Sequence, residues 1–271
     1  FAQKSDARAS KKKWFPYSKG GGFRRWFGND FDVINWENDG AEIRENLIGK
    51  NPNIPRSESY YFKEGITWGL ITSANFSARL SPQGGIFDVG GSKAFPQAED
   101  RPYFLGYLNS GLSSKLLKVL NPTLNFQVGD LKRLPIKGIT DKRASVTRTV
   151  NQLISLSKSD WDAYETSWDF ITLPLLQSDH RAETLEGTYT TLRTHWQGMT
   201  DEMLTLEEEN NRIFIDAYGL QDELTPEVPL NEITLTCNPA YRYGVKNDVD
   251  ANESRLRADT MAEFLSYAVG C

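Results

Sequence analysis

The most regular pattern of hydrophobic and polar positions lies between residues 185 and 220. Apolar residues recur there at intervals of alternately four and three residues, the a/d spacing of a coiled coil, through five heptads. The pattern predicts one long helix that ends near Gly219 and is about 50 Å long. The seam positions are Leu185, Tyr189, Leu192, Trp196, Met199, Met203, Leu206, Asn210, Ile213, Ala217 and Leu220.

A second apolar segment is the expected packing partner of this helix. It contains Val146, Val150 and Leu153. The polar Asn210 in the seam would fix the register at some cost in stability. Glycines inside the predicted helix, at positions 187 and 198, weaken the prediction that it is unbroken, because glycine is a poor helix former.

Residues 1–137 show a different texture, in which short aromatic and β-branched segments alternate with turn residues. Strands are predicted in FDVINW (31–36), YYFKEGITWGLI (60–71) and GGIFDVGG (84–91). One helix is predicted in residues 101–122, because Pro102 suits a first turn, Pro122 ends the pattern and five apolar residues share a face. Those residues are Leu105, Leu108, Leu112, Leu116 and Val119.

The change of texture near Gly138 and Thr140 predicts two domains. The expected fold class is α+β: a mixed α/β domain over residues 1–138, followed by a helical spacer with long antiparallel helices over residues 139–271. The net charge of −5 divides at the same place. Residues 1–137 hold 20 basic and 13 acidic residues, a net charge of +7, and residues 138–271 hold 11 and 23, a net charge of −12. A basic half suggests a polyanionic partner, although runs of charge are also common on solvated faces.

Composition excludes several classes of protein. No apolar run approaches the ~18–20 residues of a membrane span, and the N-terminal residues lack the apolar segment of a secretory signal, so we expect no membrane partner and a cytoplasmic location. Two cysteines, Cys237 and Cys271, build neither a disulfide framework nor a multi-cysteine zinc site. The two histidines have no metal-ligand spacing, so we expect structural or solvated roles for them and no metal in this chain.

Three segments come near motifs of nucleotide or methyl-transfer chemistry, and none of them matches completely. KGGGFRRWFGN (19–29) lacks the Lys-Ser or Lys-Thr of a P-loop and has Arg25 in place of the third glycine of G-x-G-x-x-G. FDVGG (87–91) misplaces the first glycine of F-x-G-x-G. Asn238-Pro239-Ala240-Tyr241 differs by one residue from the N-P-P-Y of amino-directed DNA methyltransferases, and we expect it to form a turn between a strand and a polar loop.

Long blocks of the chain resemble the PglX family, the adenine-specific DNA methyltransferases of BREX phage-defence systems. The blocks are KKKWFPYSKGGGFRRWFGNDFDVINWENDGAEIR, YYFKEGITWGLITSANFSARLSPQGGIFDVGGSKAFP, YFLGYLNSGLSSKLLKVLNPTLNFQVGDLKRLPI and SKSDWDAYETSWDF. YLNSGLSSKLLK with VGDLKRLPI also resembles the target recognition domains of combined restriction-modification methyltransferases. The resemblance implies a target recognition domain over residues 1–138, which would recognise duplex DNA beside a catalytic domain that binds S-adenosylmethionine. No position here matches the family's cofactor or catalytic motifs, so no catalytic residue and no cofactor are expected in this chain.

Candidate DNA contacts follow from residue type. Glycines let backbone amides approach a phosphate closely, and lysines and arginines supply positioning charge. The phosphate candidates are Lys11, Lys12, Lys13, Lys19, Gly21, Gly22, Arg24, Arg25 and Lys115, whereas Trp26 is expected in the core. Bases are read by amides, hydroxyls and arginines on exposed loops. Those candidates are Asn75, Ser77, Arg79, Gln83, Ser92, Lys93, Asn121, Asn125 and Gln127, each of which is also a typical turn or capping residue.

Two alternatives to DNA recognition stay open. The chain could be a stand-alone nuclease domain, although no cluster of carboxylates and lysine stands out beyond chance. It could also be an interaction scaffold whose helical half docks other BREX proteins. Divalent-metal-dependent cleavage of DNA would favour the first, and a salt-independent protein complex without DNA binding would favour the second.

Overall fold

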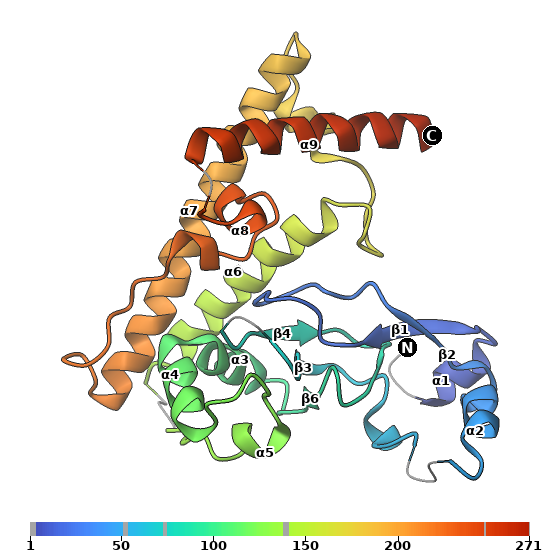
Figure 1. Cartoon of the computed structure of the whole chain (residues 1–271). Coiled ribbons are helices and arrows are strands. Elements are labelled where there is room, and N and C mark those ends of the chain that lie inside the picture. Colours follow the sequence, from blue (N-terminus) through green and yellow to red (C-terminus); the bar gives the residue numbers. More distant parts are fainter. Residues whose placement is uncertain (1–3, 51–53, 73–74, 138–140, 247, 271) are drawn as a thin grey trace. The chain divides into compact units, whose positions relative to one another are not determined.

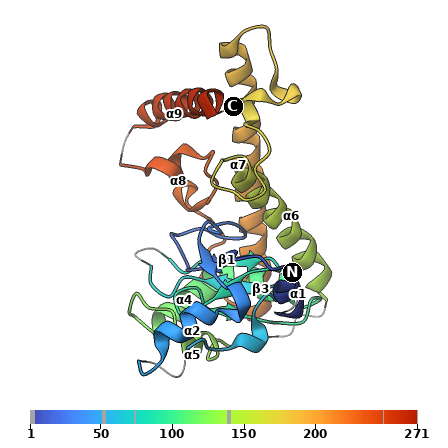
Figure 2. The same cartoon turned by 90° about the vertical axis from the view of Figure 1, so that its right-hand side faces the viewer.

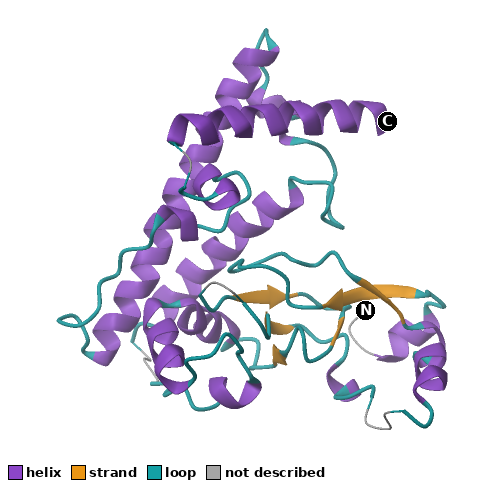
Figure 3. Ribbon diagram, viewed as in Figure 1, coloured by secondary structure: helices purple, strands orange, loops and turns teal. Residues whose placement is uncertain are grey.

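The structure, a computed structural model, describes residues 4–50, 54–72, 75–137, 141–246 and 248–270. The chain divides into two compact units, residues 1–147 and residues 148–271. Among the described residues, every strand lies in the first unit and the second unit is helical (Figure 3). The predicted α+β class is therefore confirmed. The domain boundary predicted between residues 138 and 139 lies outside the described residues.

The first unit contains two small three-stranded sheets. In one, β1 pairs antiparallel with β2 and parallel with β5; in the other, β3 pairs antiparallel with β4 and β6. The sequence pattern predicts β2, β3 and β5 and misses the other three strands. The elements, with η for a 3-10 helix, are α1 (Lys4–Ala9), β1 (Trp14–Ser18), β2 (Val33–Asn35), η1 (Glu37–Asp39), α2 (Ala41–Leu47), η2 (Glu58–Tyr60), β3 (Gly65–Trp68), β4 (Ala78–Ser81), β5 (Ile86–Phe87), β6 (Lys93–Ala94), α3 (Arg101–Asn109), α4 (Gly111–Leu120) and α5 (Val128–Leu131).

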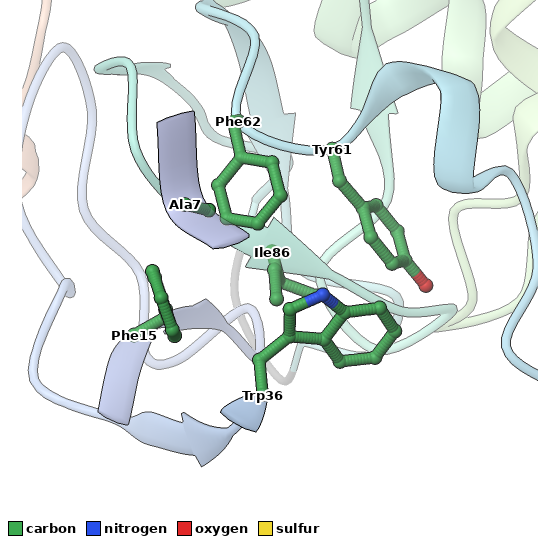
Figure 4. Close-up of a cluster of buried hydrophobic side chains, with 6 residues drawn as sticks. All are labelled: Ala7, Phe15, Trp36, Tyr61, Phe62 and Ile86. Atoms are coloured by element: carbon green, nitrogen blue, oxygen red, sulfur yellow. The ribbon is translucent and has the colours of Figure 1, made fainter. Parts of the chain in front are cut away.

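A cluster of aromatic side chains packs one face of the sheet formed by β2, β1 and β5 (Figure 4). Phe15 on β1 meets Phe62 edge to face with ring centroids 5.7 Å apart, and Trp36 meets Tyr61 at 5.2 Å. Such pairs stabilise a core beyond the area that they bury. Because successive residues of a strand point to opposite faces, the inward position of Phe15 turns its neighbours outward.

The helix predicted over residues 101–122 is two helices. The chain leaves helical geometry at Ser110, which is extended (φ −72°, ψ 151°) and accepts a hydrogen bond from the Ser113 amide at 3.2 Å. This N-cap ends α3 and starts α4. The change of direction also changes the buried face: Leu117 is fully buried, whereas Val119 is 81 % exposed.

The second unit is built around α7, which is unbroken for 34 residues through both of its glycines, as the heptad pattern predicts. Thr184 caps its start by accepting from the Gly187 amide at 3.0 Å. Gly219, at φ 69°, ends it in a Schellman motif, in which the amides of Gly219 and Leu220 donate to Asp216 and Ile215. The other elements are α6 (Arg143–Asp162, which begins in the first unit), η3 (Pro174–Leu176), η4 (Ser178–His180), α7 (Leu185–Tyr218), η5 (Leu230–Glu232), α8 (Pro239–Tyr243) and α9 (Val249–Gly270).

The seam of α7 is buried along most of its length. The seven seam positions from Tyr189 to Asn210 are each 8 % exposed or less, whereas the first, Leu185, is 48 % exposed. The contacts of α7 include η3 and η4. On α6, the residues expected to pack against the seam are fully buried: Val146, Val150 and Leu153. A coiled coil between the two helices stays a prediction.

Ion pairs fasten α9 to the rest of the second unit. Arg193 on α7 donates two hydrogen bonds to Glu253 on α9, at 2.8 and 2.6 Å, in the bidentate geometry that suits a guanidinium. Arg242 on α8 pairs with Glu263 on α9 at 2.7 Å. These contacts hold α9 across the N-terminal half of α7 (Figures 1 and 2).

Candidate nucleic-acid interface

Three exposed lysines follow α1 in a turn that two hydrogen bonds hold in place. The Ser10 hydroxyl accepts from the Lys12 amide at 3.2 Å, and the Lys13 carbonyl accepts from the Trp36 amide at 2.9 Å. The three side chains are exposed, and Lys11 has a left-handed φ of 54°. The turn therefore presents three positive charges from a backbone anchored at the end of β2.

An exposed tryptophan comes directly after these lysines. Trp14 on β1 is 57 % exposed, and the Nζ atom of Lys13 lies 5.6 Å from the centre of its ring. Trp14 pairs with Asn35 and Pro16 pairs with Val33 across the sheet, so these residues share the face opposite to Phe15. Sequence reasoning missed this exposed aromatic face. The alternation of WFPYS could have indicated it, since a strand buries only every second residue.

The glycine triplet is a crossing point of the backbone. A Cβ atom on Gly20 would lie 2.6 Å from the Gly90 carbonyl oxygen and 2.9 Å from the Gly69 Cα, and its φ is 94°. The close approach at Gly20 is therefore made to other segments of the chain. Gly21 and Gly22 are exposed, and the Asn29 amide donates to the Gly22 carbonyl at 2.9 Å. These two glycines keep their predicted phosphate role as a proposal.

Lys19 is partly neutralised by a carboxylate. Its Nζ atom lies 3.3 Å from the Asp88 carboxylate, which also accepts from the Tyr17 hydroxyl and the Gly90 amide, both at 2.7 Å. Burial acts to raise the pKa of Asp88, but the bonds from Tyr17 and Gly90 and the charge of Lys19 outweigh it and hold that pKa below its usual value. This ion pair makes Lys19 less available to a phosphate.

The arginines of the glycine–arginine loop do not lie on an exposed loop as the sequence suggests. Arg24 and Arg25 are 2 % and 5 % exposed, and the Arg24 Nε donates to the Phe27 carbonyl at 2.7 Å. Arg79 on β4 is 2 % exposed and donates to the carbonyls of Arg24, at 3.2 Å, and Gly20. Arg79 therefore supports the loop by bonding to two of its backbone carbonyl groups. The sequence does not reveal this, because exposure of an arginine depends on tertiary packing.

Three further base-reading candidates are also buried. Ser77, Ser92 and Lys93 are 7–8 % exposed. Burial lowers the pKa of Lys93 to about 8, with the charge of Asp30 opposing it. Burial likewise raises the pKa of Asp30, against the charges of Arg79 and Lys93. The opposite charges of Lys93 and Asp30 stabilise one another in the interior of the unit. The prediction that Ser77, Ser92 and Lys93 lie on exposed loops is wrong.

The remaining candidates lie at or near the surface. Asn121 organises a turn by donating to the Asn125 carbonyl and to Asp130, both at 2.8 Å. Gln127 caps α5 together with Asp130, which accepts from the Gln127 amide at 3.1 Å. Asn75 is half-buried. Of these remaining candidates, the exposed ones are Gln83, Lys115, Asn125 and Gln127.

A cavity of about 240 Å³ lies between α1 and η1. Arg8, Lys11 and Lys12 line one side and residues 37–39, Glu-Asn-Asp, line the other. Arg8 lies 3.7 Å from the Asp39 carboxylate. The cavity therefore combines charges of both signs and does not select a simple anion.

The tetrapeptide in the second unit is a helix cap. Asn238 is 1 % exposed, its Oδ1 accepts from the Ala240 amide at 3.1 Å, and its Nδ2 donates to the Leu230 and Ile233 carbonyls at 2.8 and 2.9 Å. The sequence predicts a turn between a strand and a polar loop here, whereas the structure has the N-cap of α8. Among the described residues, no three His, Cys, Asp or Glu side chains gather as a metal site would require.

The two histidines meet in the second unit. His180 on η4 and His195 on α7 have ring centroids 4.9 Å apart, and His180 is 8 % exposed. Burial and then the charge of His195 lower the pKa of His180, whereas Asp179 acts in the opposite direction. The neutral imidazole is therefore the form that fits this contact.

We expect the chain to lose stability partly through His180 as the pH falls below about 6.5. Its folded pKa is lowered, so the stability from the neutral ring is present above the unfolded value of about 6.5 and is lost as the pH falls below it. Urea unfolding at successive pH values measures the effect. His180→Gln should flatten the pH dependence in this range, and an unchanged dependence would contradict the role of this contact.

Comparison with known proteins shows similarity to bacterial adenine-specific methyltransferases, although no protein-family model matches the chain. The chain is 39 % identical over 268 residues to the adenine-specific methyltransferase PglX of Lacticaseibacillus casei (strain Zhang). It is 35 % identical over 262 residues to the adenine-specific methyltransferase BrxX of Escherichia coli O9:H4 (strain HS). Each match covers 96 % of this chain and 21 % of the relative, so the chain spans about a fifth of the length of the curated relatives it matches. The resemblance found in the sequence is confirmed.

Proposed function

We propose that this chain is the DNA-recognition part of a BREX-type adenine-specific DNA methyltransferase that acts in phage defence. The observation that carries the proposal is the row of exposed lysines after α1, in a half of the chain with a net charge of +7. The similarity to one part of PglX and BrxX supports the same reading. Methyl transfer, with S-adenosylmethionine as the cofactor, belongs in this proposal to a catalytic domain elsewhere in the whole protein.

Phosphate contacts position a protein on DNA, and base contacts select the sequence. In this proposal, Lys11, Lys12 and Lys13 bind phosphates of duplex DNA. Further phosphate contacts are proposed for Lys19, Gly21, Gly22 and Lys115. The exposed candidates for base reading are Gln83, Asn125 and Gln127. Arg24 and Arg79 hold the loop in shape, because their guanidinium groups donate to backbone carbonyls.

We expect the triple variant Lys11→Ala, Lys12→Ala, Lys13→Ala to bind all duplexes more weakly. Each lost phosphate contact should flatten the slope of log affinity against log salt by about 0.9, so three contacts remove roughly three units. Fluorescence anisotropy across a salt series measures both quantities. The control is Arg148→Ala, Arg181→Ala, Lys246→Ala, which removes three exposed charges from the second unit. Equal slopes for the two triple variants would contradict the assignment.

A second candidate function, an interaction scaffold for other BREX proteins, is favoured by one observation. Leu265 and Val269 on α9 are 63 % and 88 % exposed and lie one turn apart. No helix among the described residues is long and apolar enough to cross a membrane, so this apolar pair is not part of such a helix. A stoichiometric protein complex that Leu265→Ser abolishes, formed by a chain that binds no DNA, would favour the scaffold over DNA recognition.

A further inference from the structure

We propose that Trp14 is a stacking platform for an unpaired nucleobase. The proposal rests on the proposed DNA-binding function and adds a class of ligand to it. Trp14 is 57 % exposed, although tryptophan is among the more buried residues on average. The next residue, Phe15, is 1 % exposed in the aromatic cluster of Figure 4, so the strand holds one aromatic ring inside and the other outside.

The backbone that carries the ring is held in place before any ligand arrives. The backbone of Trp14 pairs with Asn35, and the Trp36 amide donates to the Lys13 carbonyl at 2.9 Å, so both ends of the segment are tied to β2. Pro16 and Val33 lie on the same face of the sheet as Trp14, and Val33 is 44 % exposed. A flat aromatic face on a rigid strand loses little entropy when a base stacks on it.

The charge around the ring selects a nucleic acid over an apolar protein surface. The Lys13 ammonium lies 5.6 Å from the centre of the ring, and Lys11 and Lys12 precede it in the chain. A purely apolar partner on the ring would desolvate the Lys13 ammonium without neutralising it. Single-stranded nucleic acid offers both a stacking base and neighbouring phosphates, the combination that aromatic and basic binding grooves use.

The same geometry distinguishes unpaired bases from a duplex. Inside a duplex a base presents only its edges in the grooves, and its face is covered by neighbouring bases. The face of Trp14 therefore matches a base that has left the stack. The lysines serve both forms of DNA, because both carry phosphates.

Fluorescence anisotropy with a fluorescein-labelled oligo-dT strand and with a duplex of equal length tests the proposal at low salt. Trp14→Ala should weaken binding of oligo-dT by about 5- to 100-fold, as loss of one stacked base predicts, and change duplex binding by less than about twofold. Trp14→Phe should retain most of the affinity for oligo-dT. The matched control is Trp168→Ala in the second unit, where the tryptophan is 59 % exposed and no loss is expected.

Different experimental results would overturn this inference and the proposed function. If the unmodified chain binds neither DNA, both fall. If it binds duplex DNA and Trp14→Ala lowers the affinity for oligo-dT no more than Trp168→Ala does, DNA recognition stands and the stacking role is overturned. If Trp14→Ala leaves DNA binding intact but changes the mass measured by light scattering, the face is an interface between copies of the chain and the proposal is likewise overturned.

Discussion

Replacing Leu192 with aspartate should lower the free energy of unfolding of the chain by about 4 kcal/mol, because it places an unpaired charge in the buried seam of α7. Leu192 is fully buried, and Trp196, the next seam residue, is 5 % exposed. The substitution also removes a leucine side chain that fills this space, so a cavity adds to the cost. Thermal and urea unfolding, followed by circular dichroism, measure the loss.

The matched control for this variant is Thr194→Asp, which adds the same carboxylate two residues further along α7. Thr194 is exposed, and its hydroxyl donates only to the Thr190 carbonyl of the same helix, at 3.0 Å. The expected change is within about 1 kcal/mol, because surface substitutions rarely exceed this. Equal melting temperatures for the two variants would show that the heptad pattern does not define the buried face.

Replacing Asp160 with alanine should cost about 3–5 kcal/mol of stability in the second unit. Asp160 on α6 is 2 % exposed, and its carboxylate accepts from the Thr236 amide at 2.7 Å and from the Cys237 amide at 2.9 Å. The variant leaves two amides without this partner, and hydrogen bonds to a charged group contribute about 1.5–3 kcal/mol each. Urea unfolding measures the difference.

Glu165→Ala serves as the control for Asp160→Ala, since it removes an exposed carboxylate five residues further along the chain. We expect it to change stability by no more than about 0.5 kcal/mol. Asp160→Asn should fall between the two, because an amide oxygen accepts one of the hydrogen bonds and its NH₂ group faces the other donor. A loss for Asp160→Ala no larger than that of the control would contradict the anchoring role of this carboxylate.

The sequence predicts the long helix well because its evidence is local. Eleven seam positions repeat at heptad spacing, and Gly219 supplies the left-handed residue that a helix end favours. The break at Ser110 is harder to predict, because a single Ser-Gly step interrupts an otherwise continuous apolar pattern. Strands of two residues, such as β5 and β6, depend on their partners in the sheet more than on their own composition.

The candidate interface is predicted only in part, since a residue type does not fix its exposure. The lysines after α1 are exposed, as expected for charged residues in a polar turn. Arg24, Arg25 and Arg79 are buried, and the guanidinium groups of Arg24 and Arg79 satisfy backbone carbonyl groups of the loop. Trp14 shows the converse, an aromatic side chain that the fold leaves outside.

The backbone crossing makes tolerance of sequence change uneven across the first unit. A methyl group on Gly20 would lie 2.6 Å from a carbonyl oxygen, and one on Gly91 would lie 2.3 Å from the Ser18 carbonyl oxygen, so neither position can accept even alanine without a backbone shift. At the lysine row the side chains face solvent, and the backbone restricts substitution only at Lys11, whose φ is 54°. Evolution can therefore raise or lower the charge of that row one residue at a time, while the backbone crossing at Gly20 and Gly91 stays fixed.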